Sequence, residues 1–328
     1  SFKMKKKNLT GKLGTKKMIY QYTYKDIFQL LLGVIIFSLF ISNNTKAANL
    51  PNLPFDIDNQ NFCVKEPDAF DRDYHHVMII IDRTSFLEEQ QVKWITENLF
   101  NKSFIDEFRP YTRFSLLFVD DKSPQLQELA YSKCRPKSGK KSKQWKDEKF
   151  TGNENEMVVK AFYDRFLNGK NDIGFADLGS TIGSTVSANN SWIFETMIHA
   201  LTTRSLEFRE KDYDQRTLII VSDLMQHSPE YSLYRECNAK LAIKSMNKCP
   251  SFDNALSKNK VLDEYLTFTR PKDSLENLDV HLYFLNFKHE TNREISISLI
   301  NFWGDYFRKI GVEIPSSIED WTTWQTRY

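Results

Sequence analysis

Three aspartates in this chain each follow an apolar run, and hydroxyl side chains stand beside two of them. Asp82 comes after five consecutive large apolar residues and is followed by Thr84 and Ser85. Asp223 follows a second run that ends in a serine, and Asp120 follows a third. Carboxylate and hydroxyl oxygens are the ligands that hard divalent cations such as Mg²⁺ prefer. The three aspartates would also suit a divalent-metal-dependent hydrolase or phosphotransferase, which stays open as an alternative.

The apolar runs also predict the elements that carry these aspartates. Runs without polar alternation are typical of strands buried on both faces, as in a parallel sheet covered by helices. We expect such strands at residues 77–82, 112–120, 217–223 and 280–285. Apolar residues at helical spacing predict helices at residues 88–100, 156–167, 192–201, 258–268 and 295–310, the last ended by Gly311.

This alternation of strands and helices predicts an α/β protein. We expect a three-layer sandwich with a mostly parallel central sheet and helices on both faces. Ligands of such sheets bind at the carboxyl ends of the strands, where the three aspartates would lie. A loop rich in glycine and hydroxyl residues, 179–185, adds Thr181 and Thr185 as further oxygen ligands.

The order of these segments resembles the von Willebrand factor A domain family. In that family the first strand ends in the motif DxSxS, a loop supplies a threonine, and a later strand ends in an aspartate. Together these residues form a metal-ion-dependent adhesion site. The resemblance spans about residues 74–312, and it implies an α/β fold with a site for Mg²⁺ and a protein partner.

The resemblance assigns each metal-binding role to a position in this chain. Asp82 matches the first acid of the motif, Thr84 matches the first hydroxyl, and Asp223 matches the last acid. Thr181 and Thr185 are both candidates for the loop threonine.

One position departs from the family pattern. Phe86 stands where the second serine should be, and a phenyl ring cannot bind a metal ion. The site is therefore expected to be degenerate. A metal-free form stays open, in which the acids cap backbone N–H groups or pair with Arg83.

The resemblance implies that the protein binds a partner protein as a scaffold component and is not an enzyme. Ser85, Phe86 and His227 are the residues expected on the contact surface. An enzyme would need a positioned base or nucleophile with a supporting group, and no such set stands out among the scattered histidines. A further alternative is a purely structural domain that docks onto a neighbouring subunit through exposed Trp321 and Trp324.

The amino-terminal residues predict export. Residues 1–26 hold eight lysines and one acid, and residues 27–41 are almost entirely apolar. We expect residues 1–47 to be either a signal peptide or a retained membrane anchor, residues 48–73 a linker, and residues 74–328 the folded domain. Both outcomes place the domain outside the cytoplasm, in the periplasm or an equivalent compartment, as part of a bacterial-type envelope assembly.

Charge and cysteines narrow the choice of partners and compartment. Residues 27–328 carry 37 basic and 42 acidic side chains, the wrong balance for a nucleic-acid-binding protein.

Two insertions are expected, at about residues 121–155 and 226–270, and both should emerge beside the site. Four cysteines in an oxidising compartment predict two disulfides, whose pairing the sequence leaves open: Cys63, Cys134, Cys237 and Cys249.

Overall fold

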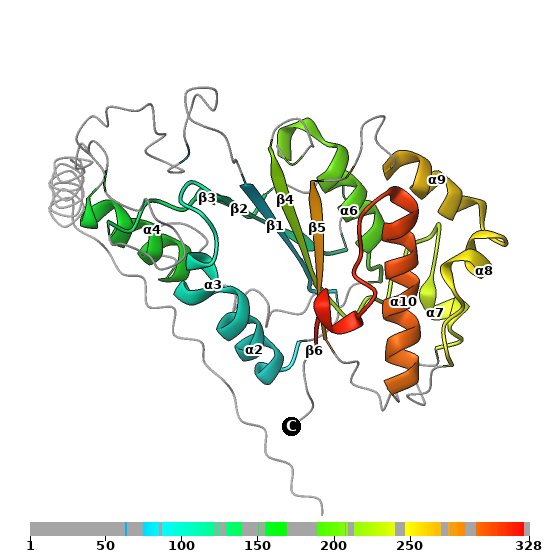
Figure 1. The fold of residues 1–328 in the computed structure, drawn as a ribbon. Coiled ribbons are helices and arrows are strands. Elements are labelled where there is room, and N and C mark those ends of the chain that lie inside the picture. The colour runs from blue at the N-terminus through cyan, green and yellow to red at the C-terminus, as the bar shows by residue number, and fades with distance from the viewer. Residues whose placement is uncertain are drawn as a thin grey trace, which may run out of the picture. The chain divides into compact units, whose positions relative to one another are not determined.

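A six-stranded sheet runs through the centre of the protein, with its strands in the order β3-β2-β1-β4-β5-β6 (Figure 1). The computed structural model describes residues 63, 75–84, 87–121, 124, 129–139, 150, 155–168, 189–206, 208, 213–239, 247–269, 275, 277–285 and 293–324. The strands are β1 (His75–Asp82), β2 (Arg113–Val119), β3 (Tyr131–Cys134), β4 (Gln215–Ser222), β5 (Leu278–Phe284) and β6 (Thr322–Trp324).

The sheet is parallel except at one edge. β1 pairs in parallel with β2 and with β4, β5 continues from β4, and β6 continues from β5. β3 alone among the described strands runs antiparallel, against β2. The predicted mostly parallel α/β sheet is therefore confirmed. The four expected strands are present, whereas β3 and β6 have only four and three residues and were not anticipated.

Helices cover the sheet on both sides (Figure 1). They are α2 (Glu89–Leu99), α3 (Lys102–Asp106), α4 (Glu156–Asn168), α6 (Ile193–Thr202), α7 (Leu233–Glu236), α8 (Phe252–Leu256), α9 (Lys260–Thr269) and α10 (Arg293–Ile310), with short 3-10 turns at Arg204–Leu206 and Ile318–Asp320. The five predicted helices are confirmed as α2, α4, α6, α9 and α10. Gly311 follows α10 at φ +96°, the left-handed conformation that commonly ends a helix.

The main hydrophobic core lies between one face of the sheet and the helices α6, α8, α9 and α10. Alternate residues of the central strands, such as Met78 and Leu218, point into it. Phe194 of α6 stacks on Trp303 of α10 with ring centroids 4.2 Å apart. Phe252 and Leu262 come from the segment predicted as an insertion, and both belong to this core. The segment predicted as an insertion therefore forms part of the helical layer, and it also begins close to the carboxyl end of β4.

Trp321 is buried, which contradicts the alternative of docking through an exposed tryptophan at this position. Its side chain is 2% exposed and packs against α10 at Gly304. A Cβ atom on Gly304 would come within 3.0 Å of the Trp321 ring, so the glycine makes room for the indole. Trp324 belongs to β6 and so extends the sheet. Truncation after Gly311 would remove a core side chain and an edge strand.

Two disulfides settle the pairing of the four cysteines. Cys63 is bonded to Cys134 at the end of β3, and Cys237 is bonded to Cys249 across a separation of 12 residues. The first bond ties the chain that precedes β1 to the edge of the sheet. Within the part of the chain that the structure describes, no helix is both long and apolar enough to cross a membrane. The predicted apolar segment, residues 27–41, lies outside that part.

Candidate binding site at the carboxyl edge of the sheet

Asp82 closes β1 at the carboxyl edge of the sheet and is only 4% exposed. Its Oδ1 accepts hydrogen bonds from the backbone N–H and the hydroxyl of Thr84, at 3.0 and 2.5 Å. Its Oδ2 accepts hydrogen bonds from the hydroxyls of Ser191 and Ser222, at 3.0 and 2.8 Å. Such charge-assisted bonds offset the free energy of removing a carboxylate from water.

The hydroxyls that surround Asp82 come from three segments that are distant in sequence. Thr84 lies in the turn after β1, Ser191 lies two residues before the start of α6, and Ser222 ends β4. Because β1 and β4 pair in parallel with Ile81 opposite Val221, Ser222 falls beside Asp82. We call Asp82, Thr84, Ser191 and Ser222 the Asp82 cluster.

Backbone hydrogen bonds hold Ser191 in place. Its N–H donates to the carbonyl of His227 at 2.6 Å, and its carbonyl accepts from the N–H of His227 at 2.8 Å. The His227 ring bonds the Ser232 hydroxyl through Nδ1 at 2.9 Å. Burial, and then the nearby Arg235 charge, lower the pKa of His227 below its ordinary value. His227 therefore serves the site as a neutral side chain whose backbone positions Ser191.

Asp223 borders the cluster and is held by a turn of its own. Its Oδ1 accepts the N–H of Met225 at 2.9 Å, an arrangement typical of aspartate in tight turns. The intervening Leu224 has φ +62°, a conformation that costs a residue with a side chain about 1 kcal/mol. The Leu224 N–H donates to the Ser222 hydroxyl at 2.8 Å, and its carbonyl accepts from the Trp303 indole at 3.0 Å. These bonds stabilise the turn after β4.

Asp120, the third predicted acid, is engaged elsewhere. Its Oδ2 forms an ion pair with Nη2 of Arg83 at 2.9 Å, and the guanidinium lies 4.5 Å from the centre of the Phe118 ring. Among the described residues, no group of three or more histidine, cysteine, aspartate or glutamate side chains is arranged to hold a metal ion. A catalytic centre that combines Asp82, Asp120 and Asp223 is therefore not favoured.

The predicted site residues are thus divided between those in contact and those that cannot be placed. Asp82 and Thr84 are hydrogen-bonded to each other, and Asp223 directly follows Ser222. Four predicted residues lie outside the part that the structure describes: Ser85, Phe86, Thr181 and Thr185. Ser191 is the member of the cluster that no sequence motif predicted. The one sequence feature that could have identified Ser191 is its position just before the helix predicted from residue 192, because a hydroxyl there lies at the sheet edge.

The oxygen atoms of the cluster suit a hard cation. Thr84 and Ser191 each donate a proton to Asp82, which leaves lone pairs of both hydroxyl oxygens turned away from the carboxylate. Asp223 adds a carboxylate directly after Ser222, and all of these donors are oxygens, as Mg²⁺ prefers. Asp82 accepts two hydrogen bonds on each of its oxygens, so both oxygens are engaged within the cluster. The residues present therefore fit Mg²⁺ in their chemistry.

Comparisons with known proteins identify only distant structural likenesses. No family model matches the chain, and no curated protein matches it in sequence. The proximal thread matrix protein 1 of the mussel byssus is 12% identical over 65% of this chain and 38% of its own, with a TM-score of 0.27. A von Willebrand factor type A protein from Catenulispora acidiphila is 10% identical over 74% of this chain and 44% of its own, with a TM-score of 0.31.

A third likeness is to the conserved hypothetical protein BatB from Bacteroides thetaiotaomicron. It is 9% identical over 75% of this chain and 92% of its own, with a TM-score of 0.29. This chain spans less than half the length of the first two structures. At these TM-scores the likenesses carry no argument about function.

Proposed function

We propose that this protein is a binding module similar to von Willebrand factor A domains, and that it recognises a partner protein at the carboxyl edge of its sheet. The Asp82 cluster carries the proposal. A buried carboxylate there gathers hydroxyls from three separate segments at the edge where sheets of this type bind ligands.

Each residue of the site has a distinct part in the proposed binding. Asp82 orients the hydroxyls of Thr84 and Ser191, and these oxygens with Asp223 face the partner. A bound Mg²⁺ would supply a coordination position for a carboxylate of the partner, as the resemblance implies. Thr181 and Thr185 remain candidates for an additional ligand.

The geometry of the neighbouring groups supports binding over catalysis. The His227 ring, nearest to the cluster in sequence, is bonded to the Ser232 hydroxyl through Nδ1. The Asp120 carboxylate is paired with Arg83. Neither group therefore provides the oriented acid or base that a hydrolase requires.

The two disulfides support an oxidising location. With the basic residues 1–26 and the apolar residues 27–41, they favour an exported protein whose domain lies in the periplasm or an equivalent compartment. We place its partner in an envelope assembly. The apolar segment would act there either as a cleaved signal peptide or as an anchor.

A capture experiment tests the site. The full chain is cross-linked in native membranes as wild type, as Asp223→Asn, and as Asp263→Asn, which removes an exposed charge on α9. The asparagine at 223 keeps an acceptor for the Met225 N–H but loses the charge. Loss of one charge-assisted contact should weaken partner capture about tenfold or more.

The same experiment has two outcomes that contradict the proposal. Equal capture of the partner by the wild type and by Asp223→Asn would exclude this edge as the binding surface. Unchanged capture together with loss of Mg²⁺-dependent hydrolysis of a phosphate ester would favour the metal-dependent hydrolase. Capture that chelation weakens in the wild type and in Asp263→Asn would support a Mg²⁺ contribution.

A further inference from the structure

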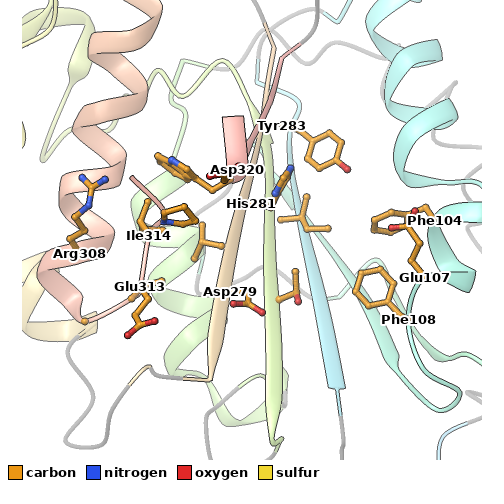
Figure 2. A pocket seen from close by; sticks show the side chains of 17 residues that line it. Phe104, Glu107, Phe108, Asp279, His281, Tyr283, Arg308, Glu313, Ile314 and Asp320 are labelled. Atoms are coloured by element: carbon orange, nitrogen blue, oxygen red, sulfur yellow. The ribbon is translucent and has the colours of Figure 1, made fainter. Parts of the chain in front are cut away.

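A groove of about 990 Å³ lies on the face of the sheet opposite the main core (Figure 2). Its floor is formed by β4 and β5, where Thr217, Ile219 and His281 alternate with residues that point into the core. One wall is α3 and the residues after it. The other is the end of α10 and residues 311–315. We call this the sheet-face groove, and its volume is at the upper end for ligand pockets.

The sheet-face groove is separate from the Asp82 cluster. None of the four cluster residues lines it. Its floor begins near the amino ends of β4 and β5, at Thr217 and Asp279, whereas the cluster lies at the carboxyl ends of β1 and β4. A ligand in the groove would therefore contact a different surface.

Acidic side chains surround the groove (Figure 2). Glu107 stands on one wall, Glu313 on the other, and Asp279 on the floor between them, while Asp320 lies farther along. Arg308 is the one lysine or arginine among the described lining residues, and it is paired with Asp305 at 3.0 Å. Desolvation raises the pKa of Asp279, which a cation nearby would offset. The surface therefore favours cationic ligands and disfavours phosphates and acidic peptides.

Apolar groups lie directly beside these acids. The half-buried side chains of Phe108 and Ile314 face the groove from opposite walls. Trp321 also lines it, and its buried indole N–H has no hydrogen-bond partner within the described part of the protein. The groove thus combines carboxylates for a cation with apolar contacts for the residues beside it.

We propose that the sheet-face groove binds a peptide segment of a partner protein that carries lysine or arginine beside apolar residues. The basic groups of the segment lie against Glu107, Asp279 and Glu313, and its apolar side chains lie against Phe108 and Ile314. The contact is electrostatic in part, so salt weakens it. This second surface lets the protein engage two partners, or two parts of one partner.

Two synthetic peptides test the proposal. Both repeat the same leucine and serine residues, and one carries lysines where the other carries glutamates. Their binding to the full chain is measured by isothermal titration calorimetry. The lysine peptide should bind the wild type and the glutamate peptide should not. The double variant Asp279→Asn, Glu313→Gln should bind the lysine peptide about tenfold or more weakly.

A matched control separates the groove from general surface charge. The double variant Asp263→Asn, Glu264→Gln removes the same charge from the exposed side of α9, and it should bind the lysine peptide as the wild type does. The variant Asp223→Asn should also bind the lysine peptide as the wild type does. The proposal for the groove and the proposal for the carboxyl edge can therefore be contradicted separately.

Three results would overturn the proposal. The first is equal binding of the lysine peptide by the wild type and the groove variant. The second is equal binding of the two peptides by the wild type. The third comes from sedimentation: if the wild type self-associates and the groove variant does not, the occupant is a second copy of the chain and not a partner segment.

Discussion

β1 and β4 lie side by side and share one sequence pattern, an apolar run followed by an acid, yet their aspartates have different roles. Asp82 is the last residue of its strand, is buried, and binds three hydroxyls. Asp223 follows its strand by one position and accepts the N–H of Met225. Because Ser222 falls beside Asp82, register and not pattern decides which acid becomes the centre of the site.

The largest predicted effect is that of Asp82→Ala. The substitution leaves the hydroxyls of Ser191 and Ser222 and the N–H of Thr84 without their acceptor in a buried place. We expect a loss of about 3 kcal/mol or more in the free energy of unfolding, measured by urea denaturation. If Asp223→Ala destabilises the protein as much, the two aspartates are equivalent and the comparison fails.

The amino ends of the same two strands predict a pH dependence. His75 bonds the Thr217 hydroxyl through Nε2 at 2.8 Å, and burial lowers its pKa to about 4. An unfolded histidine titrates near pH 6.5, so between pH 6.5 and 4 the unfolded chain binds more protons. Stability is therefore full above pH 6.5 and falls as the pH drops toward 4. We expect this residue to contribute about 2–3 kcal/mol to the fall.

A variant isolates this contribution from that of the carboxylates. His75→Gln removes the titrating group, and its free energy of unfolding should depend less steeply on pH between 6.5 and 4 than that of the wild type. His76, whose pKa burial lowers well below its ordinary value, remains in both proteins. Parallel pH profiles for the two proteins would show that His75 is not buried as a neutral ring.

A smaller effect distinguishes the two serines that bind Asp82. The Ser222 hydroxyl donates to Asp82 and accepts from the Leu224 N–H, whereas the Ser191 hydroxyl makes only the bond to Asp82 among the described contacts. Ser222→Ala should therefore cost about 2 kcal/mol and Ser191→Ala about 1 kcal/mol in urea unfolding. A larger loss of stability for Ser191→Ala than for Ser222→Ala would show that the Ser191 hydroxyl makes stabilising contacts besides its bond to Asp82.

The smallest predicted effect on stability is that of Asp223→Asn. The asparagine can still accept the Met225 N–H, so the turn after β4 should persist. We expect the free energy of unfolding to change by about 0.5 kcal/mol or less, while partner capture falls. A loss above about 1 kcal/mol would show that the charge of Asp223 supports the fold as well as the site.

Most of the sheet and the longer helices could be predicted because their signals are local. Apolar runs marked β1 and β4, and helical spacing marked α2 and α10. β3 and β6 escaped prediction because three or four residues hold too little periodicity. The burial of Trp321 could not be predicted locally, because its partner, Gly304, lies on a helix whose position depends on the completed fold.

The sequence predicted that Asp82 and Asp223 lie at one edge of the sheet, but not which hydroxyls bind Asp82. Asp82 and Thr84 are two residues apart, so their pairing could be anticipated from the chain alone. Ser191 and Ser222 join Asp82 from 109 and 140 residues away, and their contact depends on the pairing of β1 with β4 and on the approach to α6. No local sequence pattern predicts contacts between residues that are so far apart in the chain.

The long separations around Asp82 make its cluster depend on both halves of the chain. β1, β2, β3 and the Cys63–Cys134 bond need nothing beyond residue 134. Both hydroxyls that satisfy Asp82 Oδ2 arrive with the later half of the chain, once β4 has paired with β1. Contacts between such distant residues are typical of slowly folding chains, because closing long loops costs entropy. A chain that ends before β4 would lack the Ser222 hydroxyl and the strand that sets it beside Asp82.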